Sequence, residues 1–328
     1  MVCKNRKKLR WPGRPLFAAA VFATLAACAS SPKPETFYAD RGDSFALMAP
    51  GADIYLSADV EAARPILDRL SMGGFGGGEI SQFLDMTNSI TAALYGSGPR
   101  RFLAAASGNY PSARGGIFFS ASKDWAKTKS ASGIAYWHSD KSALSVYLGP
   151  ASAYVSDADP FVSAPGAESP AGLAELKAGA VLSGWMDKPG VPLNRIIAAL
   201  GVPVQIPADR LVFGVYRAEE TAVSTGNRSS TGAEKTSAGD GLYRAALRLE
   251  TQSETQAAAL ARIFTMAKLA SAFADFSAME SGAGLASLTA VFLSNVPERN
   301  GSVLTLTTGV MNGTDIALLF NTLAVYSN

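Results

Sequence analysis

The N-terminus joins a basic segment, an apolar segment and a cysteine, and this combination limits how the rest of the chain can fold. Residues 1–15 hold six lysines and arginines and no acid. The apolar segment after them, residues 16–27, has only twelve residues, whereas a helix needs about 20 to cross a bilayer. The order predicts a cleaved secretory signal. Because the two cysteines are Cys3 and Cys28, the mature body must fold without an internal disulfide.

The residues before Cys28 are Leu25, Ala26 and Ala27, and the run resembles the lipobox of bacterial lipoproteins. In that class the cysteine becomes the first mature residue and carries diacylglycerol and a fatty acyl chain such as palmitate. The resemblance implies this covalent lipid on Cys28 and no other cofactor. Ala29, in place of aspartate, resembles the signal for sorting to the outer membrane. Several acyl chains, at about 0.8 kcal/mol per buried methylene, would anchor the protein stably.

Loss of the signal changes the charge of the protein. The whole chain has 29 Lys and Arg against 27 Asp and Glu, but six of the basic residues lie in the signal, so the mature charge is near −4. No cluster of Lys or Arg marks a nucleic-acid surface. We therefore expect no nucleic-acid partner and a membrane contact that depends on acyl chains or apolar side chains.

Composition divides the chain into segments. Prolines at 32 and 34 indicate an extended tether, and prolines at 160, 165 and 170 indicate a linker. The stretch 219–240 is rich in Ser, Thr and Gly and predicts a mobile loop. The predicted segments are a signal peptide (1–27), the lipidated cysteine and tether (28–44), a first α+β repeat (45–160), a linker (161–172) and a second α+β repeat (173–328).

The predicted fold class is α+β, with two related halves that each form an antiparallel sheet with packed helices. Asp59 is a candidate helix N-cap after a strand at 53–58, and Asp187 stands after a similar strand in the second half. Both halves then follow the order strand, helix, hairpin, helix, hairpin, which indicates an internal duplication or a chance likeness of two α+β segments. The pattern also predicts a strand at 116–120 and a helix through 80–94.

A predicted helix at 254–276 carries the most suggestive pattern of the body. Its apolar side chains recur at helical spacing while its other side has few charges. Such a helix packs on a sheet in most proteins, but it also suits the wall of an apolar cavity or a membrane interface. The candidate contact residues for lipid or an apolar ligand are Leu260, Ile263, Met266, Ala270 and Phe273.

Signals for catalysis and metal binding are weak. His138 is the single histidine, and it follows a predicted strand in a region where a surface or turn role is expected. The chain has no Gly-x-Ser-x-Gly elbow and no pair of cysteines for a zinc site after the signal is removed. We expect a protein that is not an enzyme, with no catalytic residues and no metal.

The lipobox, the two α+β halves, the lack of a disulfide and the apolar-faced helix together resemble the treponemal outer-membrane-associated lipoproteins. The resemblance implies a lipid-anchored protein of the cell envelope, at the periplasmic face of the outer membrane, with amphipathic helices that bind membrane lipid or an apolar ligand. The alternative function is a structural or assembly lipoprotein that binds an envelope protein. An enclosed apolar cavity would favour a lipid carrier, whereas an exposed apolar patch suits either function.

Overall fold

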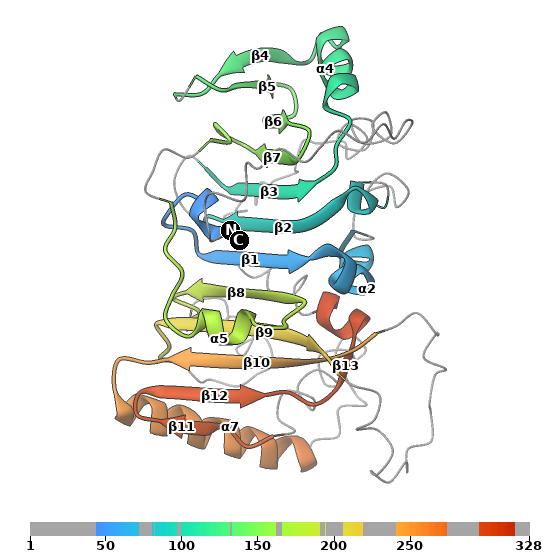
Figure 1. Cartoon of the computed structure of the whole chain (residues 1–328). Coiled ribbons are helices and arrows are strands. Elements are labelled where there is room, and N and C mark those ends of the chain that lie inside the picture. The colour runs from blue at the N-terminus through green and yellow to red at the C-terminus, as the bar shows by residue number, and fades with distance from the viewer. Residues whose placement is uncertain are drawn as a thin grey trace, which may run out of the picture.

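The computed structural model describes residues 44–71, 81, 83–96, 100–131, 133–161, 166–190, 194, 206–218, 241–273 and 295–318. Within these residues, thirteen strands form one sheet in which every described pair is antiparallel (Figure 1). The predicted α+β class with antiparallel strand pairing is confirmed. The predicted signal, the predicted lipidation site Cys28 and the predicted loop at 219–240 lie outside the described residues.

The described helices lie between groups of strands along the chain. The described helices are η1 (Ser44–Leu47, 3₁₀), α2 (Val60–Ser71), α4 (Ser112–Ala121), α5 (Leu173–Lys177) and α7 (Glu254–Phe273). The described strands are β1 (Ile54–Asp59), β2 (Thr87–Leu94), β3 (Phe102–Gly108), β4 (Ala126–Lys129), β5 (Ala135–Ser139), β6 (Leu144–Leu148), β7 (Ser152–Ser156), β8 (Leu182–Asp187), β9 (Arg210–Arg217), β10 (Leu242–Glu250), β11 (Glu298–Asn300), β12 (Val303–Thr307) and β13 (Met311–Asn312).

The sheet is continuous across the middle of the chain. Its strand order is β11-β12-β10-β9-β8-β1-β2-β3-β7-β6-β5-β4, with β13 beside β10. Strands β1 and β8, which come from the two halves, pair with Leu56 opposite Gly184. The prediction of a separate sheet in each half was therefore wrong, because these two strands satisfy each other's backbone hydrogen bonds and leave neither half with a free edge there.

The two faces of the sheet build two different cores, because successive side chains of a strand point to opposite faces. On one face, which we call the helical face, Ile54 and Met186 pack with residues of α2 and α7. On the opposite face, Tyr55 and Trp185 pack with η1 and α5. The centre of the sheet is thus covered on both sides.

Aromatic stacking reinforces the central pair of strands. Tyr55 of β1 and Trp185 of β8 stack with ring centroids 4.2 Å apart, and Phe45 of η1 meets the Trp185 ring edge-on at 4.6 Å. All three side chains are at most 2% exposed. The Tyr55 hydroxyl donates a hydrogen bond to the Ala49 carbonyl at 3.0 Å, so its polar end is satisfied although it is buried.

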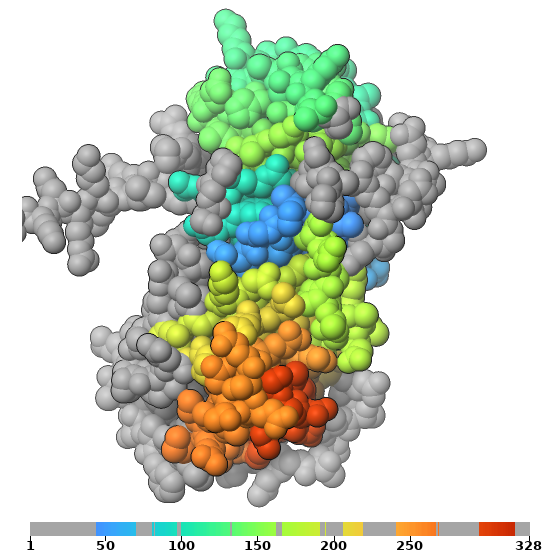
Figure 2. Space-filling view, turned by 90° about the vertical axis from the view of Figure 1, so that its left-hand side faces the viewer, coloured from blue at the N-terminus to red at the C-terminus, as the bar shows by residue number. Residues whose placement is uncertain are grey.

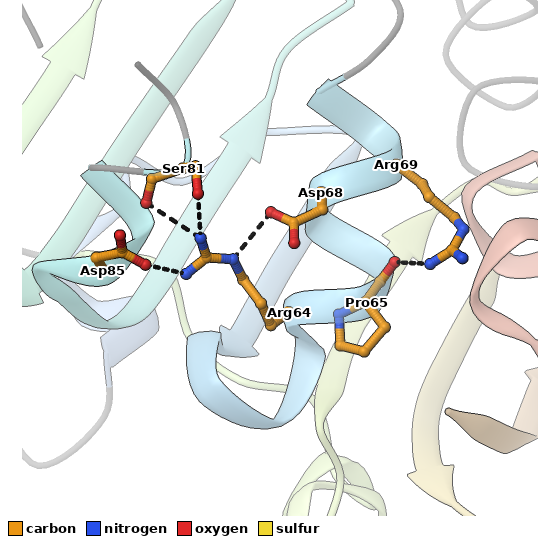
Figure 3. Close-up of polar contacts among 6 residues, drawn as sticks. All are labelled: Arg64, Pro65, Asp68, Arg69, Ser81 and Asp85. Carbon is orange, nitrogen blue, oxygen red and sulfur yellow. Dashed lines mark hydrogen bonds and ion pairs between the residues drawn. The ribbon is translucent and has the colours of Figure 1, made fainter. Parts of the chain in front are cut away.

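Helix α2 is fixed at its start and along its side. Asp59 Oδ1 accepts a hydrogen bond from the Ala62 amide at 2.9 Å, which confirms the predicted N-cap. Farther along, Arg64 contacts Asp68 at 2.8 Å and reaches across to Asp85 at 2.7 Å and to Ser81 (Figure 3). Burial alone would lower the pKa of Arg64, but the hydrogen bonds to the two aspartates raise it. Arg64 therefore holds α2 against the segment that leads into β2.

Two predicted elements were wrong. The segment 116–120 belongs to α4 rather than to a strand, because a helix places Phe119 in edge-on contact with Trp125 at 4.9 Å and in a stack with Trp137 at 5.6 Å. The segment 87–94 is β2 rather than a helix. Its apolar residues Ile90 and Leu94 are four apart, a spacing that fits a helical turn and also one face of a strand.

The central aromatic contact gives a first prediction. We expect Trp185→Ala to lower the free energy of unfolding by about 3–5 kcal/mol, because it leaves a cavity between Tyr55 and Phe45. Ile117→Ala is the control, since Ile117 is 70% exposed and surface substitutions usually change stability by less than about 0.5 kcal/mol. Urea unfolding followed by circular dichroism measures both. Equal stabilities of the two variants would contradict a buried Trp185 at the centre.

Candidate functional site

Helix α7 carries the residues that the sequence singled out, and it lies at the β11–β12 end of the sheet (Figure 1). The segment is rich in alanine, which favours helix. Its first turn is capped because Ser253 Oγ accepts a hydrogen bond from the Gln256 amide at 3.3 Å. Ala257 and Leu260 are fully buried, and Phe264 packs against the same core on the helical face.

The structure separates the predicted contact residues. Leu260 is 0% exposed and belongs to the core, and Ile263 is half-buried. Met266 is 61% exposed, because six residues of helix turn it about 120° away from Leu260. The backbones of Ala270 and Phe273 lie in α7, while their side chains are outside the described part of the chain. Leu260 thus has a packing role, and Met266 remains a candidate for contact.

The outer side of α7 is neutral to basic. A row of exposed residues follows this side at intervals of four, three and four along the helix. The row consists of Thr255, Ala259, Arg262 and Met266. In Figure 2 the orange residues, which belong to β10 and α7, lie in the lower part of the visible face. An aliphatic side chain beside a long cationic one is a combination that suits a membrane interface.

The hollow of about 410 Å³ at the end of the central strands is not an apolar ligand cavity. Arg210 Nε donates to Asp187 Oδ1 at 2.8 Å, and the Gly96 amide donates to Asp53 at 2.8 Å. Burial raises the pKa of Tyr55 nearby, and the charge of Asp187 adds to this effect. The lining residues are Gly51, Ala52, Asp53, Asp187, Lys188, Asp209 and Arg210.

A second hollow, of about 330 Å³, lies on β11 and β12. It is lined by Asn295, Val296, Glu298, Thr305 and Thr307. Its lining is mainly polar and offers little to an acyl chain.

His138 makes polar contacts that resemble part of a catalytic triad. Its Nδ1 lies 3.0 Å from Ser145 Oγ, and its Nε2 lies 3.1 Å from Asp140 Oδ1. Ser145 is only 1% exposed, so a substrate cannot reach its hydroxyl. The geometry supports a structural role for His138 between β5 and β6 rather than nucleophilic catalysis.

The described part of the chain holds no metal cluster and no membrane-spanning helix. Among them, no three His, Cys, Asp or Glu side chains come together in a way that would hold a metal ion. No helix within the described ranges has the length and apolar character needed to cross a membrane.

The sequence analysis missed exposed aliphatic residues, among them Ile117 and Val296. Ile117 lies on α4 and is 70% exposed. The segment 116–120 was expected to be a strand, so the outward direction of Ile117 could not be inferred. Over so short a segment, the spacing of apolar residues does not distinguish a strand from a helix.

Comparison with known proteins gives a family and a relative. The model of the family "Outer membrane-associated lipoprotein TP0453" matches residues 40–156. "Outer membrane protein TP0453" of Treponema pallidum (strain Nichols) is 29% identical over 104 residues, which cover 32% of this chain and 36% of that protein. The aligned segment thus spans about a third of the relative. These matches confirm the predicted resemblance to treponemal outer-membrane-associated lipoproteins.

Solved structures extend the likeness of the fold beyond the aligned segment. Crystal form I of TP0453 superimposes with a TM-score of 0.52 and 16% identity, covering 87% of this chain and 99% of that one. Crystal form III gives 0.51 and 16%, covering 85% and 98%. At this identity the structures show a shared fold. The names of the family and the relative describe outer membrane proteins and no enzyme, in agreement with the predicted outer membrane localisation.

The two sides of α7 give a second prediction. Leu260→Ala should lower the free energy of unfolding by about 2–5 kcal/mol, because its side chain is fully buried in the core. Met266→Ala should change it by less than about 0.5 kcal/mol, because the side chain is largely in solvent. Urea denaturation of the two variants measures the difference. A larger loss for Met266→Ala would mean that α7 packs on its opposite side.

Proposed function

We propose that the chain is a non-enzymatic lipoprotein, anchored by acyl groups on Cys28 to the periplasmic face of the outer membrane, whose helix α7 binds membrane lipid. The names of the family and the relative support the membrane and the lipoprotein class. The lipobox supports the anchor. One observation supports a lipid contact by α7: Met266, on the outer side of the helix, is 61% exposed.

The physical basis of this contact is the transfer of Met266 out of water. Fully burying a methionine side chain is worth about 1.5–3 kcal/mol. Arg262, one turn before Met266 on the same side, is also exposed and can keep its charge in the headgroup layer while its methylenes lie below it. The covalent acyl chains would hold α7 close to the bilayer, so a weak contact suffices.

We also propose that the two halves arose by internal duplication. Strands β1, β2 and β3 follow one another outward from the centre, and so do β8, β9 and β10 on the other side. A helix follows the third strand of each trio, α4 after β3 and α7 after β10. An antiparallel β1–β8 pair is the arrangement expected when two copies meet about a local twofold axis.

A third prediction tests the lipid contact. The mature chain, residues 28–328 with Cys28→Ser, contains every described residue and has no acyl group. We expect it to float with phosphatidylcholine vesicles, and we expect Met266→Glu to reduce the floated fraction at least tenfold, because a carboxylate would replace an apolar contact (about 1.4 kcal/mol per factor of ten).

Thr255→Glu is the matched control, since it adds the same charge to an exposed and already polar position on the same side of α7, about three turns earlier. It should float like the unsubstituted protein. Equal flotation of all three proteins would contradict a contact through Met266. A lack of flotation by all three would assign membrane attachment to Cys28 alone and favour the alternative function, binding of an envelope protein.

A further inference from the structure

The end of the sheet opposite α7 carries a group of exposed cations. Arg114 lies on α4, Lys123 follows that helix, and Lys127 and Lys129 lie on the edge strand β4. Within the described residues these four side chains make no ion pair. Together with Ile117 they are called the basic end here. In Figure 1 this end lies at the top, at the far side of the sheet from α7.

The residues of the basic end gather on one side of the sheet. Lys127 pairs with Trp137 of β5, and its Nζ lies 5.8 Å from the centre of the Trp137 ring. Phe119 of α4 stacks on the same ring at 5.6 Å, so α4 and Lys127 share this face. Lys129 is two residues farther along β4 and points to the same face.

Acidic side chains near this end are few among the described residues. Helix α4 contains none. Asp124 forms an ion pair with Lys141 at 2.6 Å. Asp140 lies 3.1 Å from His138. His138 follows Trp137 in β5 and therefore points to the opposite face of the sheet. Asp159 accepts a hydrogen bond from the Ala131 amide just after β4 at 3.4 Å, and its charge acts on Tyr136, which points to the face opposite Trp137. The Trp137 face of this end is therefore positive, although the mature chain as a whole is near −4.

An exposed aliphatic side chain lies among these cations. Ile117 is 70% exposed, and Arg114 is three residues before it on the same side of α4. Half-buried Phe118 and Trp137 lie beneath. An aliphatic tip, aromatic rings and a rim of lysine and arginine are the parts by which proteins enter the interface of an anionic membrane.

We propose that the basic end docks on anionic phospholipid headgroups, with Ile117 inserted between them. Charge complementarity favours anionic phospholipid as the partner, because its phosphate groups attract the four cations and its acyl region accepts Ile117. The proposal rests on the proposed function only in placing the protein at a membrane. It adds a second contact surface and a lipid class, since the described outer row of α7 contains one exposed cation, Arg262, beside Met266.

The experiment compares flotation of the mature chain, with Cys28→Ser, on phosphatidylcholine vesicles and on vesicles that also contain phosphatidylglycerol. We expect phosphatidylglycerol to increase binding and the double variant Lys127→Glu/Lys129→Glu to abolish the increase, a loss of at least tenfold. Ile117→Glu should also weaken binding to the anionic vesicles. High salt should reduce the difference between vesicles, because it screens exposed charges.

The matched control is Lys188→Glu/Arg244→Glu, which makes the same change of net charge at two exposed positions away from the basic end. It should keep the full response to phosphatidylglycerol, and circular dichroism should show all variants folded. Equal loss in the control and the β4 variant would overturn the proposal, because net charge alone would then explain binding. A protein that floats equally on both vesicles would overturn it as well.

The two membrane proposals can fail separately. If Met266→Glu abolishes flotation on neutral vesicles and the β4 variant has no effect on either vesicle, the α7 contact stands and the basic end does not. If the β4 variant loses the increase caused by phosphatidylglycerol while Met266→Glu has no effect, the basic end binds anionic lipid and α7 is not a lipid contact.

Discussion

The antiparallel pair formed by β1 and β8 is the interaction on which the rest of the structure depends. These strands come from opposite halves of the chain, and each has its own half on its other side, β2 beside β1 and β9 beside β8. The stacked rings of Tyr55 and Trp185 lie directly over the pair. Without this pairing, β1 and β8 would each become an exposed edge strand, and an exposed apolar edge is a site of aggregation. The pair therefore turns two α+β segments into one sheet.

One continuous sheet has a consequence for the position of the two candidate contacts. Helix α7 and the basic end lie at opposite ends of the strand order, and neighbouring strands are about 4.8 Å apart. The strand register places Trp137 and Val146 on the same face of the sheet as Leu56. Both α4 and α7 therefore bury their apolar residues against this helical face. Met266 and Ile117, each beside arginine or lysine, thus lie near opposite ends of one continuous sheet.

Much of the fold could be predicted from the sequence, and the failures have physical causes. Strand β1, the cap at Asp59 and the antiparallel α+β class follow from local patterns that the core reinforces. The single sheet could not be predicted, because pairing of β1 with β8 joins residues far apart in the chain. The sequence predicted the helix α7 but not which of its sides is buried. Because apolar residues occupy most of its positions, spacing alone could not distinguish buried Leu260 from exposed Met266. The basic end was missed because its lysines are scattered in sequence and gather only through the β4–β5 register and α4.

The central claim is that the outer side of α7 enters the membrane while its inner side stays in the core. The mature chain with Cys28→Ser has no cysteine, so Met266→Cys gives one attachment site for an environment-sensitive fluorophore, and Lys188→Cys gives a reference site. The measurement is the emission of each label with and without vesicles that bind the protein. The account predicts a blue shift and a stronger emission at position 266 and no change at position 188. An unchanged emission at 266 on protein that is bound to the vesicles would contradict it.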